Sequence, residues 1–256
     1  MVRLLILGGT GEAVALARAA APAFAVTTSL AGVTRNPILP PGEIRRGGFG
    51  GSDGLAGYLH AHGIDAVIDA THPFAAVMSR NAVAACAQTD IPLLRLIRPA
   101  WTRQAGDDWR GVPDADSAAT AIAADRVFLT TGLRDLDAFA TRRDVWFLVR
   151  SIEQPARVPL AHYELIQARG PFDETAEIEL MRHHRIGTLV AKNSGGDATY
   201  AKIAAARALG LPVIMIARPA LPEAETVNDV ATALKWLRRT TPSMPMDARV
   251  KPGHDG

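Results

Sequence analysis

Short apolar runs alternate with alanine-rich helical patterns along almost the whole chain, and this alternation limits the possible fold more than any other feature. A short, continuous apolar run is typical of a strand that is buried on both faces of a parallel sheet. Helices between such strands build the sheet from strand–helix–strand units, so the sequence predicts an α/β protein. The expected strands cover residues 3–7, 24–29, 66–70, 92–96, 126–130, 146–151, 188–191 and 212–217.

Charge and composition exclude several classes of protein. The chain has 256 residues, a net charge of +2 and dispersed basic residues, so we expect no nucleic-acid partner. The first residues lack the pattern of a secretory signal, and no apolar stretch approaches the length of a membrane span. The single cysteine, Cys86, cannot form an internal disulfide. We therefore expect a protein of the reducing cytoplasm that is not inserted in a membrane.

A glycine-rich turn follows the first expected strand. Gly8, Gly9, Thr10 and Gly11 let the backbone turn tightly, and the helix expected behind them would present its positive N-terminal end to a phosphate. The pattern is not a complete G-x-G-x-x-G, because Val14 stands where the last glycine would be. Similar turns occur in proteins that bind nothing. The turn therefore indicates a dinucleotide site that needs support from elsewhere in the chain.

The end of the second expected strand lacks the acidic residue that NAD-specific folds place there. No Asp or Glu occurs between Glu12 and Glu43. Ser29, Gly32 and Arg35 instead offer hydrogen-bond donors and one fixed positive charge, which suit the 2′-phosphate of NADP(H). The sequence therefore predicts NADPH as the cofactor. A solvated loop arginine is the alternative interpretation of Arg35.

Polar groups interrupt the apolar pattern after the third expected strand, in the segment Asp69-Ala70-Thr71-His72-Pro73-Phe74-Ala75. They lie at the carboxyl end of the strand, which is the edge where open α/β sheets bind ligands. Pro73 would fix the backbone as a helix begins and would direct Thr71 and His72 towards the site. His72 could contact the cofactor or donate a proton. A helix cap or a packing role is the alternative.

A second polar glycine turn follows the strand expected at residues 188–191. Lys192 brings a mobile positive charge, and Asn193, Ser194 and Gly195 bring donors ahead of the next helix, which suits a carboxylate or phosphate. Further candidate contacts near strand ends are Arg98, Trp101 and Arg169. The alternative interpretation of the two arginines is that each is a surface ion-pair partner.

The alternation of strands and helices lapses around residues 98–110. We place a domain boundary there, with an N-terminal dinucleotide-binding, Rossmann-like domain over residues 1–100 and a C-terminal α/β domain over residues 101–239. The ligand site is then expected in the cleft between the domains. Residues 240–256 carry prolines and little apolar content, and we expect a disordered tail.

Six motifs, in order, resemble those of the precorrin-6A reductase family of cobalamin biosynthesis, and the resemblance covers residues from about 3 to 238. It implies NADPH-dependent reduction of a ring double bond of precorrin-6A, giving precorrin-6B, in a two-domain α/β protein with the macrocycle in the cleft. Where the family has an arginine after the Ala-Gly pair, this chain has Val33. The motifs are Ile6-Leu7-Gly8-Gly9-Thr10, Ser29-Leu30-Ala31-Gly32, Asp69-Ala70-Thr71-His72-Pro73-Phe74-Ala75, Arg98-Pro99-Ala100-Trp101, Arg169-Gly170-Pro171-Phe172 and Ala191-Lys192-Asn193-Ser194-Gly195-Gly196.

The resemblance also implies roles for individual residues. Arg98, Arg169 and Lys192 would neutralise acetate and propionate groups of the tetrapyrrole. The cofactor would supply the hydride. The proton could come from His72, Lys192, Tyr200 or water, and the sequence does not choose among them. Neighbouring enzymes of the cobalamin pathway are candidate partners, and no metal is expected.

Two other functions stay open at this point. A short-chain or epimerase-like NADP oxidoreductase would need a Tyr-x-x-x-Lys helix, and the spacing in Tyr200-Ala201-Lys202 does not put both groups on one helix face. A sensor module that only binds NADP(H) would need no second anion site, whereas the turn at Lys192 indicates one.

Overall fold

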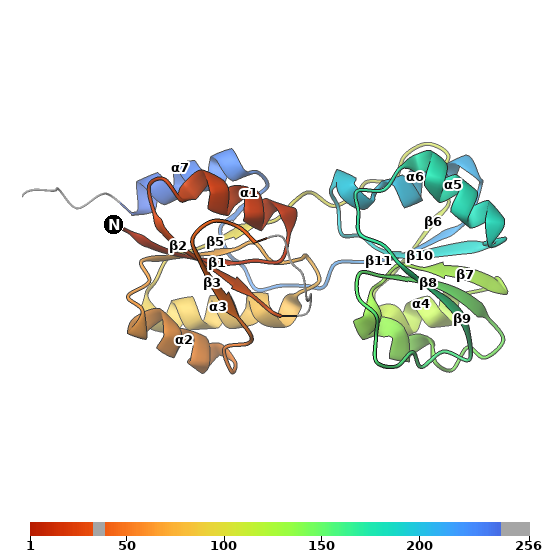
Figure 1. Cartoon of the computed structure of the whole chain (residues 1–256), viewed down its shortest axis with the longest axis horizontal. Coiled ribbons are helices and arrows are strands. Elements are labelled where there is room, and N and C mark those ends of the chain that lie inside the picture. The colour runs from red at the N-terminus through yellow and green to blue at the C-terminus, as the bar shows by residue number, and fades with distance from the viewer. Residues whose placement is uncertain (33–38, 242–256) are drawn as a thin grey trace, which may run out of the picture.

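Two parallel sheets of six strands each form the core of the molecule, and helices cover both faces of each sheet (Figure 1). The computed structural model describes residues 1–32 and 39–241. Every strand pair in these sheets is parallel, which confirms the α/β class. Within the described ranges, no helix is both long enough and apolar enough to cross a membrane.

The first sheet has the doubly wound order β12-β5-β4-β1-β2-β3. The chain builds β2 and β3 on one side of β1 and then returns to place β4 on the other side. The topological switch point, where such sheets bind ligands, therefore lies between β1 and β4. The strands are β1 (Arg3–Leu7), β2 (Ala25–Leu30), β3 (Glu43–Arg46), β4 (Ala66–Asp69), β5 (Leu93–Leu96) and β12 (Thr226–Val227).

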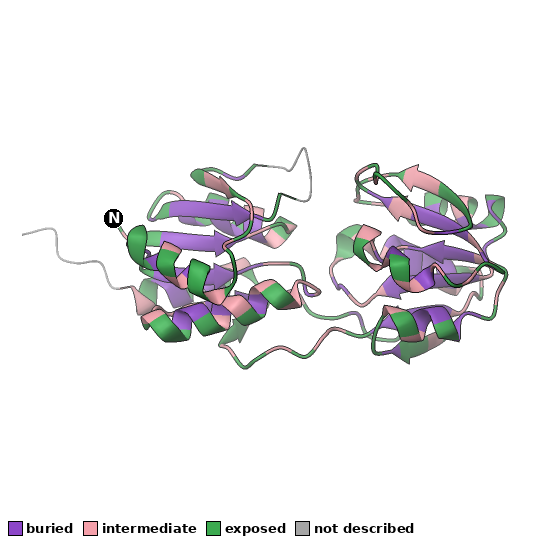
Figure 2. Cartoon of the chain, turned by 90° about the horizontal axis from the view of Figure 1, so that it is seen from below, coloured by how far each residue is buried: buried purple, intermediate pink, exposed green. Residues whose placement is uncertain are grey.

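Strand β1 is buried on both faces, which explains its uninterrupted apolar sequence. Leu4 and Ile6 pack under α1 (Gly11–Ala20) and α7 (Val230–Thr240). Leu5 and Leu7 pack on the opposite face under α2 (Ser52–Ala61) and α3 (Ala76–Thr89). Each such side chain contributes roughly 1.5–3 kcal/mol when fully buried. Figure 2 shows the buried strands between helices whose outer faces are exposed.

The C-terminal part of the chain returns to the first sheet. β12 pairs with β5, and α7 lies beside α1 (Figure 1). Ala233, Trp236 and Leu237 of α7 are buried there. The expected division at residue 100 assigns this segment to the second domain, whereas its strand and helix are built into the first. The physical reason is that the apolar face of α7 covers sheet surface that α1 does not reach.

The second sheet has the order β6-β11-β10-β7-β8-β9, so its switch point lies between β7 and β10. Helices α5 (Glu174–His183) and α6 (Ala201–Ala208) cover one face, and the short helix η2 (Asp197–Thr199) precedes α6. The other face is covered by α4 (Ala115–Ala121) and η1 (Leu133–Phe139). The strands are β6 (Trp109–Val112), β7 (Arg126–Leu129), β8 (Trp146–Ser151), β9 (His162–Gln167), β10 (Thr188–Lys192) and β11 (Val213–Ile216).

All eight expected strands are present, with ends that differ by at most one residue from those of the expected ranges. The structure adds β3, β6, β9 and β12, which the apolar pattern did not predict. These four strands are the outer strands of the two described sheets. An outer strand meets solvent along one edge and needs fewer apolar residues, so it carries a weaker signal.

Candidate active site

The glycine turn after β1 and the polar segment after β4 meet at the switch point of the first sheet. The Thr10 hydroxyl donates a hydrogen bond to the carbonyl of Ala70 (2.8 Å). The same oxygen accepts from the backbone N–H of Ala13 (3.1 Å) and caps α1. Two segments sixty residues apart in sequence therefore form one wall at the carboxyl edge of the sheet, beside the positive end of α1.

Gly8 and Gly9 are glycines for steric reasons. The N–H of Gly8 donates to the carbonyl of Ser29 (2.9 Å), and a Cβ at Gly8 would lie 2.9 Å from Cγ2 of Thr28. Gly9 has φ +115°, a conformation that other residues rarely adopt. Gly11 meets no described atom within 4 Å of a built Cβ, so its small size leaves space at the start of α1.

Ser29 lies at the end of β2, where the sequence places the contact of the 2′-phosphate. An Nη1 donor of Arg45, from β3, lies 3.4 Å from the Ser29 hydroxyl. Arg45 also stacks on Phe49, with 3.7 Å between its guanidinium carbon and the ring centre. Gly32 follows β2 with φ +74°, and Arg35 lies outside the described residues. Sequence reasoning missed Arg45 because β3 itself was not expected.

Thr71 is held in place by the buried carboxylate of Asp69. Both the hydroxyl (2.7 Å) and the N–H (3.2 Å) of Thr71 donate to Oδ1 of Asp69. Oδ2 of Asp69 lies 3.8 Å from Nε of Arg95. Neither of these two atoms has a hydrogen-bond partner among the described residues, which leaves a pair of unsatisfied polar atoms under the segment.

The expectation that a helix begins at Pro73 is wrong. The N–H of Ala75 donates to the carbonyl of His72 (2.7 Å) and closes a turn, and α3 begins only at Ala76. Pro73 is buried in this turn. The turn, rather than a helix start, therefore sets the direction of His72.

His72 is neutral at physiological pH. Desolvation is the largest cause, although the residue as a whole is exposed, and the positive charges of Arg98, Lys192, Arg218 and Lys202 add to it. Together they lower the pKa of His72 to about 3. A neutral imidazole can donate or accept a hydrogen bond, but it holds no extra proton to deliver at neutral pH.

Arg98 connects the two sheets at their carboxyl edges. Its Nη1 donates to Glu12, at the start of α1 (3.0 Å), and its Nε donates to the carbonyl of Ser194, in the turn after β10 (2.8 Å). Nearby, the ammonium of Lys192 lies 5.1 Å from the ring centre of Phe74. The polar segment after β4 and the polar turn after β10 are thus brought together.

Trp101 and Asn193 fasten the linker between the sheets to the second glycine turn. The Asn193 side chain accepts from the N–H of Trp101 (2.8 Å) and donates to its carbonyl (3.1 Å). The indole of Trp101 is buried and donates to the carbonyl of Gly196 (2.9 Å). Gly195 has φ +70°, and a Cβ there would collide with the carbonyl of Pro99. These groups shape the turn, and their polar atoms are occupied within the protein.

Lys192 faces the loop that follows β7, at the switch point of the second sheet. Its ammonium forms an ion pair with Asp135 of η1 (2.6 Å). Thr131, in the same loop, has a buried hydroxyl with no hydrogen-bond partner among the described residues. Sequence reasoning missed this loop, although a Thr-Thr-Gly sequence directly after a strand was an available signal.

Two more arginines lie by the second turn. Arg218 follows β11 and donates to the carbonyls of Asn193 (2.9 Å) and Ser194 (3.1 Å), and sequence reasoning missed it. Arg169 is exposed. Its segment contacts η2, directly after the turn, where the N–H of Phe172 donates to the carbonyl of Ala198 (3.2 Å). The second turn therefore has cations on several sides.

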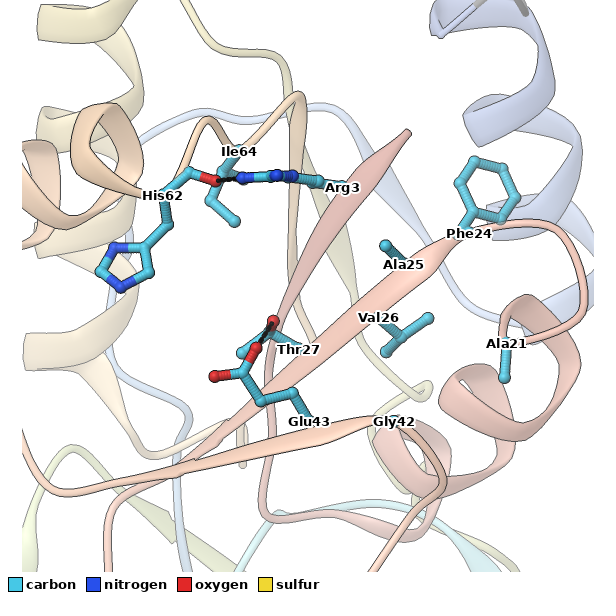
Figure 3. Close-up of a pocket in the computed structure, with 10 residues that line it drawn as sticks. All are labelled: Arg3, Ala21, Phe24, Ala25, Val26, Thr27, Gly42, Glu43, His62 and Ile64. Atoms are coloured by element: carbon cyan, nitrogen blue, oxygen red, sulfur yellow. Dashed lines mark hydrogen bonds between the residues drawn. The ribbon is translucent and has the colours of Figure 1, made fainter. Parts of the chain in front are cut away.

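A pocket of about 630 Å³ lies at the opposite, amino edge of the first sheet (Figure 3). The first residues of its strands, Arg3, Ala25 and Glu43, contribute to the lining. Arg3 donates to the carbonyl of His62 (2.7 Å), and Glu43 accepts from the hydroxyl of Thr27 (3.2 Å). Because these groups are paired and lie far from both glycine turns, we place the candidate active site at the carboxyl edge.

Fold and site together define a class of protein. The first sheet has the strand order of nucleotide-binding domains, with a glycine turn at its switch point, and the second sheet adds a cation-rich turn beside it. The chain is a two-sheet, Rossmann-like α/β protein.

Similarity to known proteins assigns the chain to one family within this class. The sequence model of the family "Precorrin-6x reductase CbiJ/CobK" matches residues 3–238. A precorrin-6A reductase of Rhodococcus erythropolis is 52% identical over 246 residues, covering 94% of this chain and 99% of the relative. One from Rhodobacter capsulatus is 46% identical, covering 93% and 96%. The solved structure of "CobK precorrin-6A reductase" superposes with a TM-score of 0.90 at 45% identity, covering 96% of this chain and 99% of that one. The chain belongs to the precorrin-6x reductase family.

Proposed function

We propose that the protein reduces a ring double bond of precorrin-6A with NADPH and so forms precorrin-6B in cobalamin biosynthesis. The observation that carries this proposal is the bridge formed by Arg98. It donates to Glu12, at the start of α1 behind the phosphate-type turn of the first sheet, and to Ser194, in the cation-rich turn of the second. A module that only binds NADP(H) would not need the second, cation-rich turn. We expect the enzyme to work in the cytoplasm, between pathway enzymes that supply precorrin-6A and consume precorrin-6B.

Residues of the first sheet would bind the cofactor. The turn from Gly8 to Gly11 would hold the pyrophosphate, because Gly8 and Gly9 have no Cβ and α1 begins there with its positive end. Thr71, His72 and Pro73 would position the nicotinamide ring. The cofactor, when bound, supplies the hydride.

The end of β2 would select NADPH over NADH. It carries no carboxylate to accept from a ribose 2′-hydroxyl, and Ser29 and Gly32 leave donors and space there. Arg35 is the proposed contact of the 2′-phosphate, and Arg45 adds a second guanidinium beside Ser29. Arg35→Ala is expected to weaken NADPH binding much more than NADH binding. Equal weakening of both would remove Arg35 from this role.

Residues of the second sheet would bind the carboxylates of the macrocycle, in a cleft between the two carboxyl edges. Arg98 and Lys192 are each held by one carboxylate, Glu12 and Asp135, and a substrate carboxylate can join or replace these partners. Arg169 would contribute from the side. The turn through Ser194 and Gly195, kept in shape by Trp101 and Asn193, would offer backbone donors.

A proton must reach the carbon next to the one that receives the hydride. The lowered pKa of His72 makes it a hydrogen-bonding group rather than an acid in the free enzyme. The Tyr200 hydroxyl is engaged by Arg207. We therefore infer that the Lys192 ammonium or a water molecule supplies the proton, with neutral His72 orienting the reacting groups.

Anaerobic incubation with precorrin-6A tests the proposal directly. NADPH absorbance should fall only when the macrocycle is present, and NADH should support a much slower reaction. The macrocycle spectrum should change in step with NADPH oxidation. A folded sample that binds NADPH but leaves precorrin-6A unchanged would contradict the proposed function.

A further inference from the structure

Asp69 is a buried carboxylate that does not itself take part in the proposed reaction. It is the last residue of β4 and lies between Leu7 of β1 and Arg95 of β5, beside the switch point of the first sheet. Only 2% of its surface is exposed. Burying a charge is costly, and a neutral asparagine could accept the same hydrogen bonds, so the charge calls for a reason.

Arg95 balances the charge of Asp69 but does not hold it by a hydrogen bond. Its Nε lies 3.8 Å from Oδ2 of Asp69, which is beyond hydrogen-bond distance. Arg95 is itself fixed by the segment before β12, because its Nη1 donates to the carbonyl of Pro222 (3.2 Å) and its N–H to that of Glu225 (2.8 Å). Within the described ranges, the Asp69 side chain accepts hydrogen bonds from Thr71 alone. The ion pair is therefore a fixed support under Thr71.

The hydroxyl of Thr71 can only accept a hydrogen bond from a ligand. A hydroxyl has one hydrogen, and Thr71 donates it to Oδ1 of Asp69 over 2.7 Å in a charge-assisted bond. No group of the described residues donates to the Thr71 oxygen, and Thr71 is only half-buried at the carboxyl edge. Because a carboxylate accepts and never donates, Asp69 fixes the direction of this bond, which asparagine would leave open.

The ligand group that meets Thr71 must therefore be a donor. Phosphates of the cofactor and carboxylates of the macrocycle accept hydrogen bonds, whereas the carboxamide of the nicotinamide ring carries an N–H₂ group. Its position along the cofactor also fits. With the pyrophosphate at the turn before α1 and the adenosine half beside Ser29 of β2, the nicotinamide end would lie across the switch point, over the end of β4.

We propose that Asp69 is a positioning residue that acts through Thr71, and that Thr71 accepts a hydrogen bond from the carboxamide of the nicotinamide ring. This bond would fix the rotation of the ring and so determine which face is turned towards the macrocycle. Asp69 makes the hydroxyl an acceptor, and Arg95 keeps the carboxylate charged and in place. The proposal rests on the proposed function, since it assigns a contact to the reacting end of the cofactor.

A cofactor analogue that lacks the donor tests this contact. In the reduced acetylpyridine analogue of NADPH, an acetyl group replaces the carboxamide, so the carbonyl stays and the N–H₂ group is absent. Isothermal titration calorimetry without any macrocycle measures the Kd of each cofactor. The wild type should bind NADPH about tenfold more tightly than the analogue, because the analogue leaves the Thr71 oxygen without a donor.

Thr71→Val removes the hydroxyl and leaves the ion pair of Asp69 with Arg95 in place. Its Kd for NADPH should rise about tenfold while its Kd for the analogue changes little, so the preference disappears. Thr71→Ser should keep the preference, because it restores the hydroxyl. The matched control is Thr120→Val, at an exposed threonine of α4, which should bind both cofactors as the wild type does.

Asp69→Asn separates a positioning role from a structural one. The amide lets Thr71 turn its hydrogen towards the ligand, so the preference for NADPH should fall below about threefold. The variant should also melt at a lower temperature, because the charge of Arg95 loses its partner. Glu177→Gln breaks another buried carboxylate–arginine pair and should melt lower too, but it should keep the full preference. A lower melting temperature for Asp69→Asn with an unchanged preference would show a structural role and overturn the proposal.

The binding measurement is separate from the proposed reaction, because it needs no macrocycle. Equal affinity of the wild type for the two cofactors, including no binding of either, would contradict the contact at Thr71. The same preference in the wild type and in Thr71→Val would contradict it as well. A preference that depends on Thr71, in a protein that leaves precorrin-6A unchanged, would instead refute the proposed reaction and leave the contact standing.

Discussion

Single residues at the carboxyl edges do most of the shaping of the candidate site, and Gly8 is the clearest case. A Cβ at this position would meet Cγ2 of Thr28 at 2.9 Å and Cδ2 of Leu30 at 3.3 Å. The turn can therefore lie against β2 only because this residue has no side chain. The sequence alone gives the glycine but not the neighbour that requires it.

Gly8→Ala should destabilise the protein by about 1–3 kcal/mol, because the added methyl group pushes β1 and β2 apart. Gly11→Ala is the control. Its built Cβ meets no described atom within 4 Å, and alanine favours the helix that begins there. Urea unfolding of both variants measures the difference. Equal stability of the two variants would show that the close approach at Gly8 does not matter.

The lowered pKa of His72 should reduce the free energy of unfolding at acid pH. Its folded pKa of about 3 lies below its ordinary value of 6.5, so the unfolded chain binds more protons between these values. The contribution of neutral His72 to stability is therefore fully present above the ordinary pKa of 6.5 and is lost as the pH falls towards the folded pKa of about 3. His72→Asn should lose less melting temperature than the wild type between about pH 7 and pH 4.

His60→Asn, on the exposed part of α2, serves as the control for this comparison and should behave like the wild type. The ring carbon signals of His72 in an NMR titration give an independent measurement. A midpoint near the ordinary value for His72 would contradict the effect of the surrounding cations.

At the scale of elements, the sequence predicts inner strands well and outer strands poorly. The eight inner strands are mostly buried and stand out as largely apolar runs, and β1 and β8 match the expected bounds. β9, with the sequence HYELIQ, is mostly exposed and gives no such run. Its pairing with β8 becomes visible only in the folded sheet. Edge position, and not length alone, decides whether a strand can be predicted.

One buried ion pair, between Arg150 and Glu177, links β8 to α5. Glu177→Gln should destabilise the protein by about 3–5 kcal/mol, since it leaves the charge of Arg150 buried without a partner. The double variant with methionine at both positions should recover most of this loss. Arg239→Ala breaks an exposed pair and should cost less than about 1 kcal/mol. Urea unfolding compares the three, and similar losses in all would contradict the importance of burial.

At the scale of the whole molecule, the sequence predicts the segments that form the site but not the contacts between them. The turns at Gly8 and Lys192 and the segment at His72 could each be predicted, because each follows an apolar strand. The bridge from Arg98 to both sheets, the pairing of Lys192 with Asp135 and the return of α7 to the first sheet could not. These depend on contacts between distant segments, which carry no local pattern.

The central claim is that NADPH bound at the first sheet reduces a macrocycle held by the second. Transfer of deuterium tests it most directly, with NADPH that carries deuterium in both hydrogen positions at the reactive carbon of the nicotinamide ring, precorrin-6A as acceptor and strict exclusion of oxygen. We predict that mass spectrometry finds one deuterium from NADPH in each molecule of product, with the second hydrogen drawn from solvent. Product without this deuterium, or NADPH that stays reduced beside intact precorrin-6A, would contradict the claim.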